Sequence, residues 1–199
     1  MLKIRDVPVA DRCFEPLTFR FGIAKIGRAL ASRPGANNEN VMTRPAIPAP
    51  PYTGSCLCGR VRYSIAARPL ALNACHCDDC KKLSGASHIV MLVAPRDAFT
   101  HASGAVERYR KRGDSGREID LARCAQCGVR LWHEPLTAPN LTYVAVGTLD
   151  DPSWAVPASH IWIERAAPGT QFEEDAVVLS GAAADRQALL EAFRKLYPD

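Results

Sequence analysis

The sequence predicts a mainly β domain that ends in a short helix. Three observations support this fold class: short segments of alternating polar and apolar residues, turn-forming residues between those segments, and one amphipathic stretch near the C-terminus. The chain has 199 residues and a hydrophobic content of 47%, which is enough for one domain with its own core.

The expected strands follow one another from residue 60 onward. Residues 60–65 alternate as a half-buried strand does, and residues 88–93 form an apolar run suited to a buried strand. Residues 106–110 and 118–122 alternate again and flank the turn residues 113–116, which predicts a hairpin. Further strands are expected at residues 129–133, 141–146 and 161–163.

One helix is expected over residues 185–197, because its apolar residues fall on a single stripe. The stripe consists of Leu189, Leu190, Phe193, Leu196 and Tyr197. We expect this helix, within residues 183–199, to pack on a domain that spans residues 52–182.

Residues 1–51 differ in composition from the rest of the chain. We expect them to form a disordered tail, or to come from a reading frame that starts too early. They contain no cysteine pair and end in the proline-rich run 44–51, which favours an extended linker. Met42 lies just before that run, so the natural protein could begin there.

The charge pattern argues against a nucleic-acid-binding or membrane protein. Residues 51–199 carry 17 basic and 17 acidic residues, so this part has no net charge with which to hold a polyanion. The longest apolar stretch, residues 88–95, is far shorter than a membrane-spanning helix. Residues 1–33 hold no apolar core of a secretion signal, so we expect a cytoplasmic, reducing location.

Seven of the eight cysteines lie in three tight clusters, and Cys13 lies apart from them. The clusters are Cys56 and Cys58, then Cys75, Cys77 and Cys80, then Cys124 and Cys127. In a reducing compartment such spacing indicates metal ligands rather than disulfides.

Cys56, Cys58, Cys124 and Cys127 are predicted to form a structural zinc site. A Cys-x-Cys pair places both sulfurs on one face of an extended chain, and a Cys-x-x-Cys pair forms a tight knuckle. Gly128 follows the knuckle and tolerates the positive φ that such a turn needs. Four thiolates complete a tetrahedral zinc site and leave no room for a substrate.

Cys75, Cys77 and Cys80 are predicted to form a second, catalytic zinc site. Three thiolates leave one coordination position open, where chemistry can occur. The complex carries a formal charge of minus one, so the metal suits a soft fourth ligand such as a substrate thiolate better than water. The spacing therefore predicts activation of a thiol.

Two alternatives remain open at this point. All eight cysteines could form four disulfides in a secreted protein, although the short spacings disfavour this. The second metal site could also be structural and be closed by His88, whereas His76 should point away from its neighbouring cysteines.

The sequence resembles the family of glutathione-dependent formaldehyde-activating enzymes and centromere protein V. The matching stretches are 54–59, 75–85, 124–128 and 160–163, with a Ser-Gly pair after the three-cysteine cluster and His-Ile-Trp further on. The resemblance implies an Mss4-like β scaffold built around zinc. It also implies the same division between the structural site and the catalytic site.

In this family, the formaldehyde-activating members join glutathione to formaldehyde to give S-hydroxymethylglutathione, formally as carbon–sulfur lyases. The resemblance thus implies a small thiol, glutathione, and a small aldehyde as substrates. Lys81 and Lys82 stand where arginines are common and could attract an anionic thiol, or could form a solvated loop. Centromere protein V shows that a non-catalytic binding module is a second possibility, and a glutathione carrier is a third.

Several other residues carry no clear functional signal. His160 and Trp162 could line a pocket, but an alternating strand of this kind is more typical of a core. Trp132 and His133 are expected to pack in the interior. The basic residues of the hairpin are expected to form a solvated surface; they are Arg108, Arg110, Lys111 and Arg112.

Overall fold

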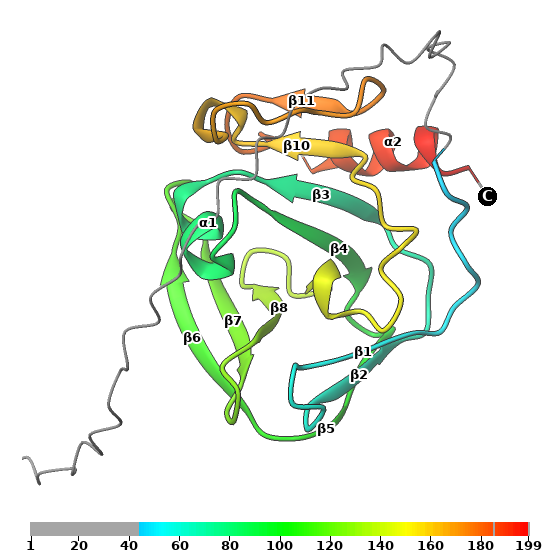
Figure 1. The fold of residues 1–199 in the computed structure, drawn as a ribbon, viewed down its shortest axis with the longest axis vertical. Coiled ribbons are helices and arrows are strands. Elements are labelled where there is room, and N and C mark those ends of the chain that lie inside the picture. The colour runs from blue at the N-terminus through cyan, green and yellow to red at the C-terminus, as the bar shows by residue number, and fades with distance from the viewer. Residues whose placement is uncertain (1–43, 185, 199) are drawn as a thin grey trace, which may run out of the picture. The chain divides into compact units, whose positions relative to one another are not determined.

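Two β-sheets make up most of the fold (Figure 1). The computed structural model describes residues 44–184 and 186–198. The small sheet has the strand order β1-β2-β5, and the large sheet has the order β11-β10-β3-β4-β9-β8-β7-β6. The strands are β1 (Tyr52–Ser55), β2 (Arg62–Ile65), β3 (Ala71–Cys75), β4 (Ile89–Pro95), β5 (Phe99–Ser103), β6 (Val106–Arg112), β7 (Glu118–Cys124), β8 (Arg130–Pro135), β9 (Leu141–Ala145), β10 (Ser159–Ile161) and β11 (Val177–Leu179). The mainly β prediction is confirmed.

The helices are short. They are α1 (Asp78–Ser84), α2 (Gln187–Leu196) and the 3₁₀ turns η1 (Val146–Thr148) and η2 (Ile163–Arg165). The predicted C-terminal helix is observed as α2, which packs against β3 and β10. Among the described residues, no helix is long and apolar enough to cross a membrane.

The expected tail over residues 1–51 can be compared with the structure only at its end, because residues 1–43 lie outside the described residues. From Arg44 to Pro51 the chain runs without helix or strand. The Arg44 guanidinium donates to the Pro157 carbonyl at 2.7 Å and to Asp175 Oδ2 at 2.7 Å. The proline-rich segment is thus attached to the domain through its first described residue.

The predicted hairpin is formed by β6 and β7, whose register pairs Arg112 with Glu118. The strand expected at residues 161–163 is shifted: β10 covers Ser159–Ile161 instead. Trp162 adopts φ 61 and ψ 40, which an extended strand cannot accommodate, so the chain turns there into η2.

Part of the hydrophobic core lies where the two sheets meet, and three of its aromatic rings pack together there. Tyr63 lies 5.6 Å from Phe99 and 6.1 Å from Trp132 between ring centroids. The Tyr63 hydroxyl bonds Thr148 Oγ1 at 2.7 Å. Gly54 lets this ring approach the backbone, because a Cβ at position 54 would lie 2.2 Å from the Tyr63 oxygen.

A parallel pairing brings the C-terminal part of the chain to the three-cysteine cluster. Strand β10 pairs with β3, so that Ile161 lies opposite Cys75. Parallel neighbours need a long connection, and here the connection includes most of the large sheet. This topology places Ser159–Ile161 beside a strand that lies 86 positions earlier in the sequence and ends at the cluster.

Candidate functional site

The four-cysteine cluster joins the turn before β2 to the turn before β8. The sulfurs of Cys56, Cys58, Cys124 and Cys127 all lie within 4.8 Å of one another. Cys56 and Cys58 are 3.4 Å apart, and Cys58 and Cys124 are 3.8 Å apart, between Sγ atoms. A tetrahedral zinc site requires S···S distances of about 3.8 Å. The donors and their spacing fit a tetrathiolate zinc ion.

Backbone amides point at these sulfurs, as expected for metal knuckles. The amide of Val61 donates to Cys56 Sγ at 3.3 Å, and that of Gln126 donates to Cys124 Sγ at 3.4 Å. Gly128 adopts φ 74, which confirms the expected left-handed turn. Burial would raise the pKa of Cys56, but hydrogen bonds from the Val61 amide and the neighbouring cysteines lower it to about 6. These hydrogen bonds thus favour the thiolate form of Cys56.

The three-cysteine cluster lies where β3 leads into α1. Cys75 ends the strand, Cys77 caps the helix and Cys80 lies in its first turn. The Cys75 and Cys77 sulfurs are 3.5 Å apart, and all three sulfurs lie within 4.8 Å of one another. Among the described residues, no fourth cysteine, histidine or carboxylate joins this group. His88, the expected alternative ligand, stacks on His76 instead.

Helix α1 was not predicted, although it and its N-cap supply two of the three sulfurs of this cluster. The Cys77 sulfur accepts from the Cys80 amide at 3.4 Å, as an N-cap oxygen would. Gly85 ends the helix with φ 67 and donates its N–H to the Lys81 carbonyl at 2.8 Å. The helix therefore fixes two of the three sulfurs.

A negative charge is favoured on one sulfur of this group. Hydrogen bonds from Cys75 and Cys80 lower the pKa of Cys77 to about 2. The hydrogen bond to Cys77 raises the pKa of Cys75. The negative charge therefore rests on Cys77, and the thiolate is the form of cysteine that binds a soft metal.

Arg130 provides positive charge beside this centre. Both its Nη atoms are buried and make no well-formed hydrogen bond to the described residues. Burial lowers the Arg130 pKa, and the nearby Cys80, Cys75 and Cys77 sulfurs oppose that effect. Arg130 is thus a buried cation whose opposing charges are the sulfurs of the cluster.

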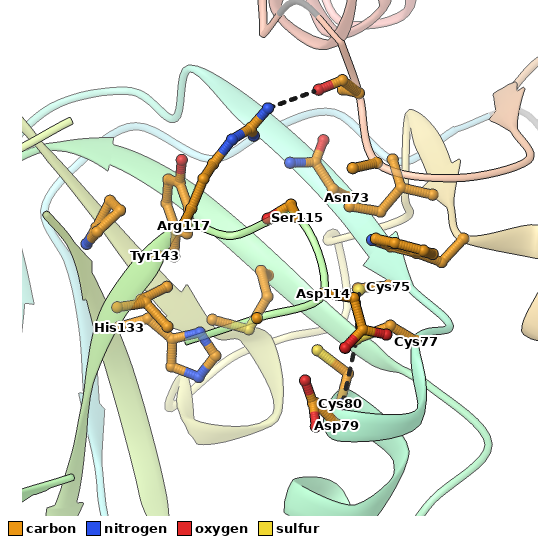
Figure 2. A pocket seen from close by; sticks show the side chains of 18 of the residues that line it. Asn73, Cys75, Cys77, Asp79, Cys80, Asp114, Ser115, Arg117, His133 and Tyr143 are labelled. Carbon is orange, nitrogen blue, oxygen red and sulfur yellow. Dashed lines mark hydrogen bonds between the residues drawn. The ribbon is translucent and has the colours of Figure 1, made fainter. Parts of the chain in front are cut away.

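A cavity of about 220 Å³ opens beside the three cysteines (Figure 2). All three cysteines line it, together with side chains from β4, the β6–β7 hairpin, β8 and the residues before α2. Most of its wall is apolar, and examples are Met91, Ile119, Leu121, Ile161 and Leu189. The four-cysteine cluster does not line this cavity. The two clusters therefore lie in different surroundings.

His160 proved to be buried, and it does not line the cavity. His160 Nε2 bonds Glu173, and because a carboxylate only accepts, His160 donates through Nε2. His160 Nδ1 then accepts from His76 Nε2, 3.0 Å away. This buried chain joins the residue between Cys75 and Cys77 to β10 and so holds the cluster against the large sheet.

Trp162, by contrast, lines the cavity and is half-buried. In the described part of the chain, Trp162 has a positive φ that is otherwise found at glycines. The Arg165 guanidinium lies 4.6 Å from the centroid of its ring. A left-handed conformation costs a tryptophan about 1–2 kcal/mol. The fold retains that strain where the indole forms part of the cavity wall.

Lys81 and Lys82 do not line the cavity. Lys81 pairs with Asp78 at 2.9 Å and donates to the Arg165 carbonyl at 2.7 Å. Lys82 is exposed on α1. A role of either lysine in substrate binding stays a prediction.

Four polar residues near the cavity carry no functional signal in the sequence. His133, expected only to pack, is buried yet lines the cavity, and Arg117 and Arg186 come from segments without a motif. Arg130 follows the second knuckle and carried no signal beyond its charge. Only the pairing of distant strands brings these residues to the cysteines.

Comparison with known proteins adds two findings. A crystal structure of a Rhodobacter sphaeroides protein is 21% identical, with a TM-score of 0.40, over 49% of this chain and 87% of that chain. The family model described as glutathione-dependent formaldehyde-activating enzyme matches residues 51–165, which include all seven clustered cysteines. The chain therefore belongs to the family of glutathione-dependent formaldehyde-activating enzymes.

Proposed function

We propose that the protein is a zinc-dependent carbon–sulfur lyase that adds a small thiol, glutathione, to formaldehyde or another small aldehyde, or reverses that addition. The observation that carries this proposal is a trio of sulfurs without a fourth protein ligand among the described residues, at the wall of a cavity. We place the activity in the cytoplasm, where both glutathione and these cysteines stay reduced.

The donor set fits zinc at both clusters. Cys56, Cys58, Cys124 and Cys127 would hold a structural ion, and Cys75, Cys77 and Cys80 would hold a catalytic ion with one open position. The catalytic ion would supply a coordination position that favours a thiol in its ionised form.

The residues around the cavity provide the other requirements of the reaction. The apolar wall excludes water from the reacting sulfur, which strengthens electrostatic interactions there. In the addition, the substrate sulfur forms a bond to the aldehyde carbon, and the carbonyl π electrons move to oxygen. That oxygen takes up one proton, which balances the proton that the thiol released. The Arg130 cation offsets the negative charge that builds up at the cluster.

The test is metal content combined with a thiol titration of the cobalt-substituted protein. We expect two metal ions per chain and a spectral change when glutathione is added, which the Cys77→Ser variant should lose. Adduct formation should also be faster with protein than without it at equal thiol concentration. A spectral change without that acceleration would indicate a glutathione carrier, and no change with any thiol would exclude thiol ligation.

A further inference from the structure

Two arginines line the same cavity as the three cysteines. Arg117 lies in the turn between β6 and β7, and Arg186 immediately precedes α2. Both side chains are half-buried and line the cavity. In the view of Figure 2, the guanidinium of Arg117 lies at the opposite end of the cavity from the labelled cysteines.

Each of these guanidinium groups has donors to spare. Arg117 Nη2 donates to the Ala183 carbonyl at 3.4 Å, and Arg186 Nη2 donates to Thr137 Oγ1 at 2.9 Å. Both acceptors are neutral, and a guanidinium has five N–H donors. Among the described residues, neither arginine pairs with a carboxylate.

Other charged residues around the cavity are already paired. Lys111 pairs with Asp79, and Asp114 pairs with Arg165. Glu118 also lines the cavity, but its side chain is exposed and contributes one negative charge against two positive ones. The half-buried wall at Arg117 and Arg186 is therefore left with uncompensated positive charge.

We propose that Arg117 and Arg186 bind a carboxylate of the thiol substrate at the end remote from its sulfur. This inference rests on the proposed function, because it takes the three cysteines as the position of the substrate sulfur. Arginine suits the role, since its planar fork pairs with both oxygens of a carboxylate.

The positions of the three cysteine sulfurs and of Arg117 define the class of thiol that would fit the cavity. Because the sulfurs and Arg117 lie at opposite ends of the cavity, the sulfur and the carboxylate must be separated by several bonds. A peptide thiol such as glutathione, with its glycyl carboxylate beyond the cysteinyl unit, has that form. A short mercapto acid does not.

The residues that complete this subsite lie outside the part of the chain that the family model matches. That match ends at residue 165, whereas Ala183, Arg186 and Leu189 follow it. The cluster would then supply chemistry common to the family, and the segment before α2 would determine which thiol is accepted.

The test compares three thiols in the wild type and in the Arg117→Gln and Arg186→Gln variants. The thiols are glutathione, its glycyl monoethyl ester and 2-mercaptoethanol. Binding is followed in the cobalt protein, and KM is followed in adduct formation. Each variant should bind glutathione about 10- to 100-fold more weakly, because a charge-assisted hydrogen bond is lost. The ester should bind wild type about as weakly as glutathione binds the variants, and 2-mercaptoethanol should not distinguish the proteins.

Arg112→Gln is the matched control. Arg112 lies in the same hairpin and donates to the Gly116 carbonyl at 3.0 Å, but it does not line the cavity. It should leave all three thiols unaffected. Unchanged glutathione binding in the Arg117 and Arg186 variants would overturn the inference, as would an equal loss of all three thiols. A wild type that binds all three equally would overturn the subsite alone, whereas one that responds to none would overturn the proposed function as well.

Discussion

The two cysteine clusters use the same ligand atoms in different surroundings. In the four-cysteine cluster, two turns from different sheets supply two sulfurs each, and backbone amides point at the sulfurs. In the three-cysteine cluster, one strand end and one short helix supply all the sulfurs, one amide donates to Cys77, and the Arg130 side chain and a cavity lie beside them. The contrast indicates that the number of ligands sets whether a site is closed, and the neighbouring residues set what an open site does.

Charge separates the clusters further. Arg130 is buried beside Cys75, Cys77 and Cys80, and Lys111, which pairs with Asp79, lines the same cavity. The four-cysteine cluster has the Val61 and Val129 amides, which lower the pKa of Cys56 and of Cys127, respectively. Amides that donate to the sulfurs can stabilise the ligands of a metal ion. Charged side chains around a cavity can, in addition, favour one ligand over another.

The largest effect should follow from breaking the closed cluster. Cys124 is 1% exposed and joins the end of β7 to the turn before β2. The Cys124→Ser variant should lose one metal ion and melt at least about 10 °C below wild type, since metal binding and folding are coupled there. Thermal unfolding with and without a chelator measures this. A variant that loses its metal but keeps its melting temperature would contradict the structural role.

The open cluster should respond in the opposite way. Serine is a good N-cap, so Cys77→Ser retains an acceptor for the Cys80 amide. We expect its melting temperature to stay within about 4 °C of wild type, while acceleration of thiol–aldehyde addition disappears. Circular dichroism and a rate assay together make this comparison. If Cys77→Ser destabilises as strongly as Cys124→Ser, the two clusters do not differ in role.

Local pattern was sufficient to predict much of the fold. Alternation located β6, β7, β8 and β9, because each is long enough to show its period. Alternation misplaced the strand near Trp162, because residue type does not mark the left-handed conformation that this tryptophan adopts at the cavity wall. It also missed β11, which has three residues, because so short a strand shows no period.

The site could be predicted only where its residues are close in sequence. The spacing of Cys75, Cys77 and Cys80 is local, so the cluster was found from the sequence alone. Arg130 reaches the cluster from the start of β8, and Arg186 reaches the cavity from the segment before α2, which packs against β3 and β10. Sequence distance hides such residues, because no short motif records a crossover connection.

The counter-charge at the open cluster can be tested next. Arg130→Met keeps an unbranched apolar side chain about as long as the methylene stem of arginine, but removes the cation beside the cysteines. Their negative charge is then less well balanced, so we expect metal affinity at the open cluster to fall about 10- to 100-fold. Competition with a chelating dye measures both sites, and the closed cluster should be unchanged.

Arg123→Met is the matched control for that experiment. Arg123 lies directly across from Arg130 in the β7–β8 register, but it is exposed and pairs with Glu107 at 2.7 Å. Its removal should leave both metal affinities as they are. Equal affinities in the Arg130 and Arg123 variants would show that the buried cation does not act on the cluster.

The smallest effect concerns acid sensitivity on the cavity side. Burial is the main cause that lowers the pKa of His133 to about 3 from its ordinary 6.5. The unfolded chain therefore binds a proton between pH 6.5 and 3 that the folded protein does not. The free energy of unfolding should be highest above pH 6.5 and fall as the pH drops, with a slope from His133 of at most about 1.4 kcal/mol per pH unit. His133→Gln should remove this contribution and make the profile measured by urea unfolding from pH 7 to pH 5 less steep, while His76, whose pKa burial lowers to about 4, keeps its own contribution. His101→Gln, at an exposed histidine, should keep the wild-type profile, and equal flattening in both variants would show that the acid sensitivity does not arise beside the open cluster.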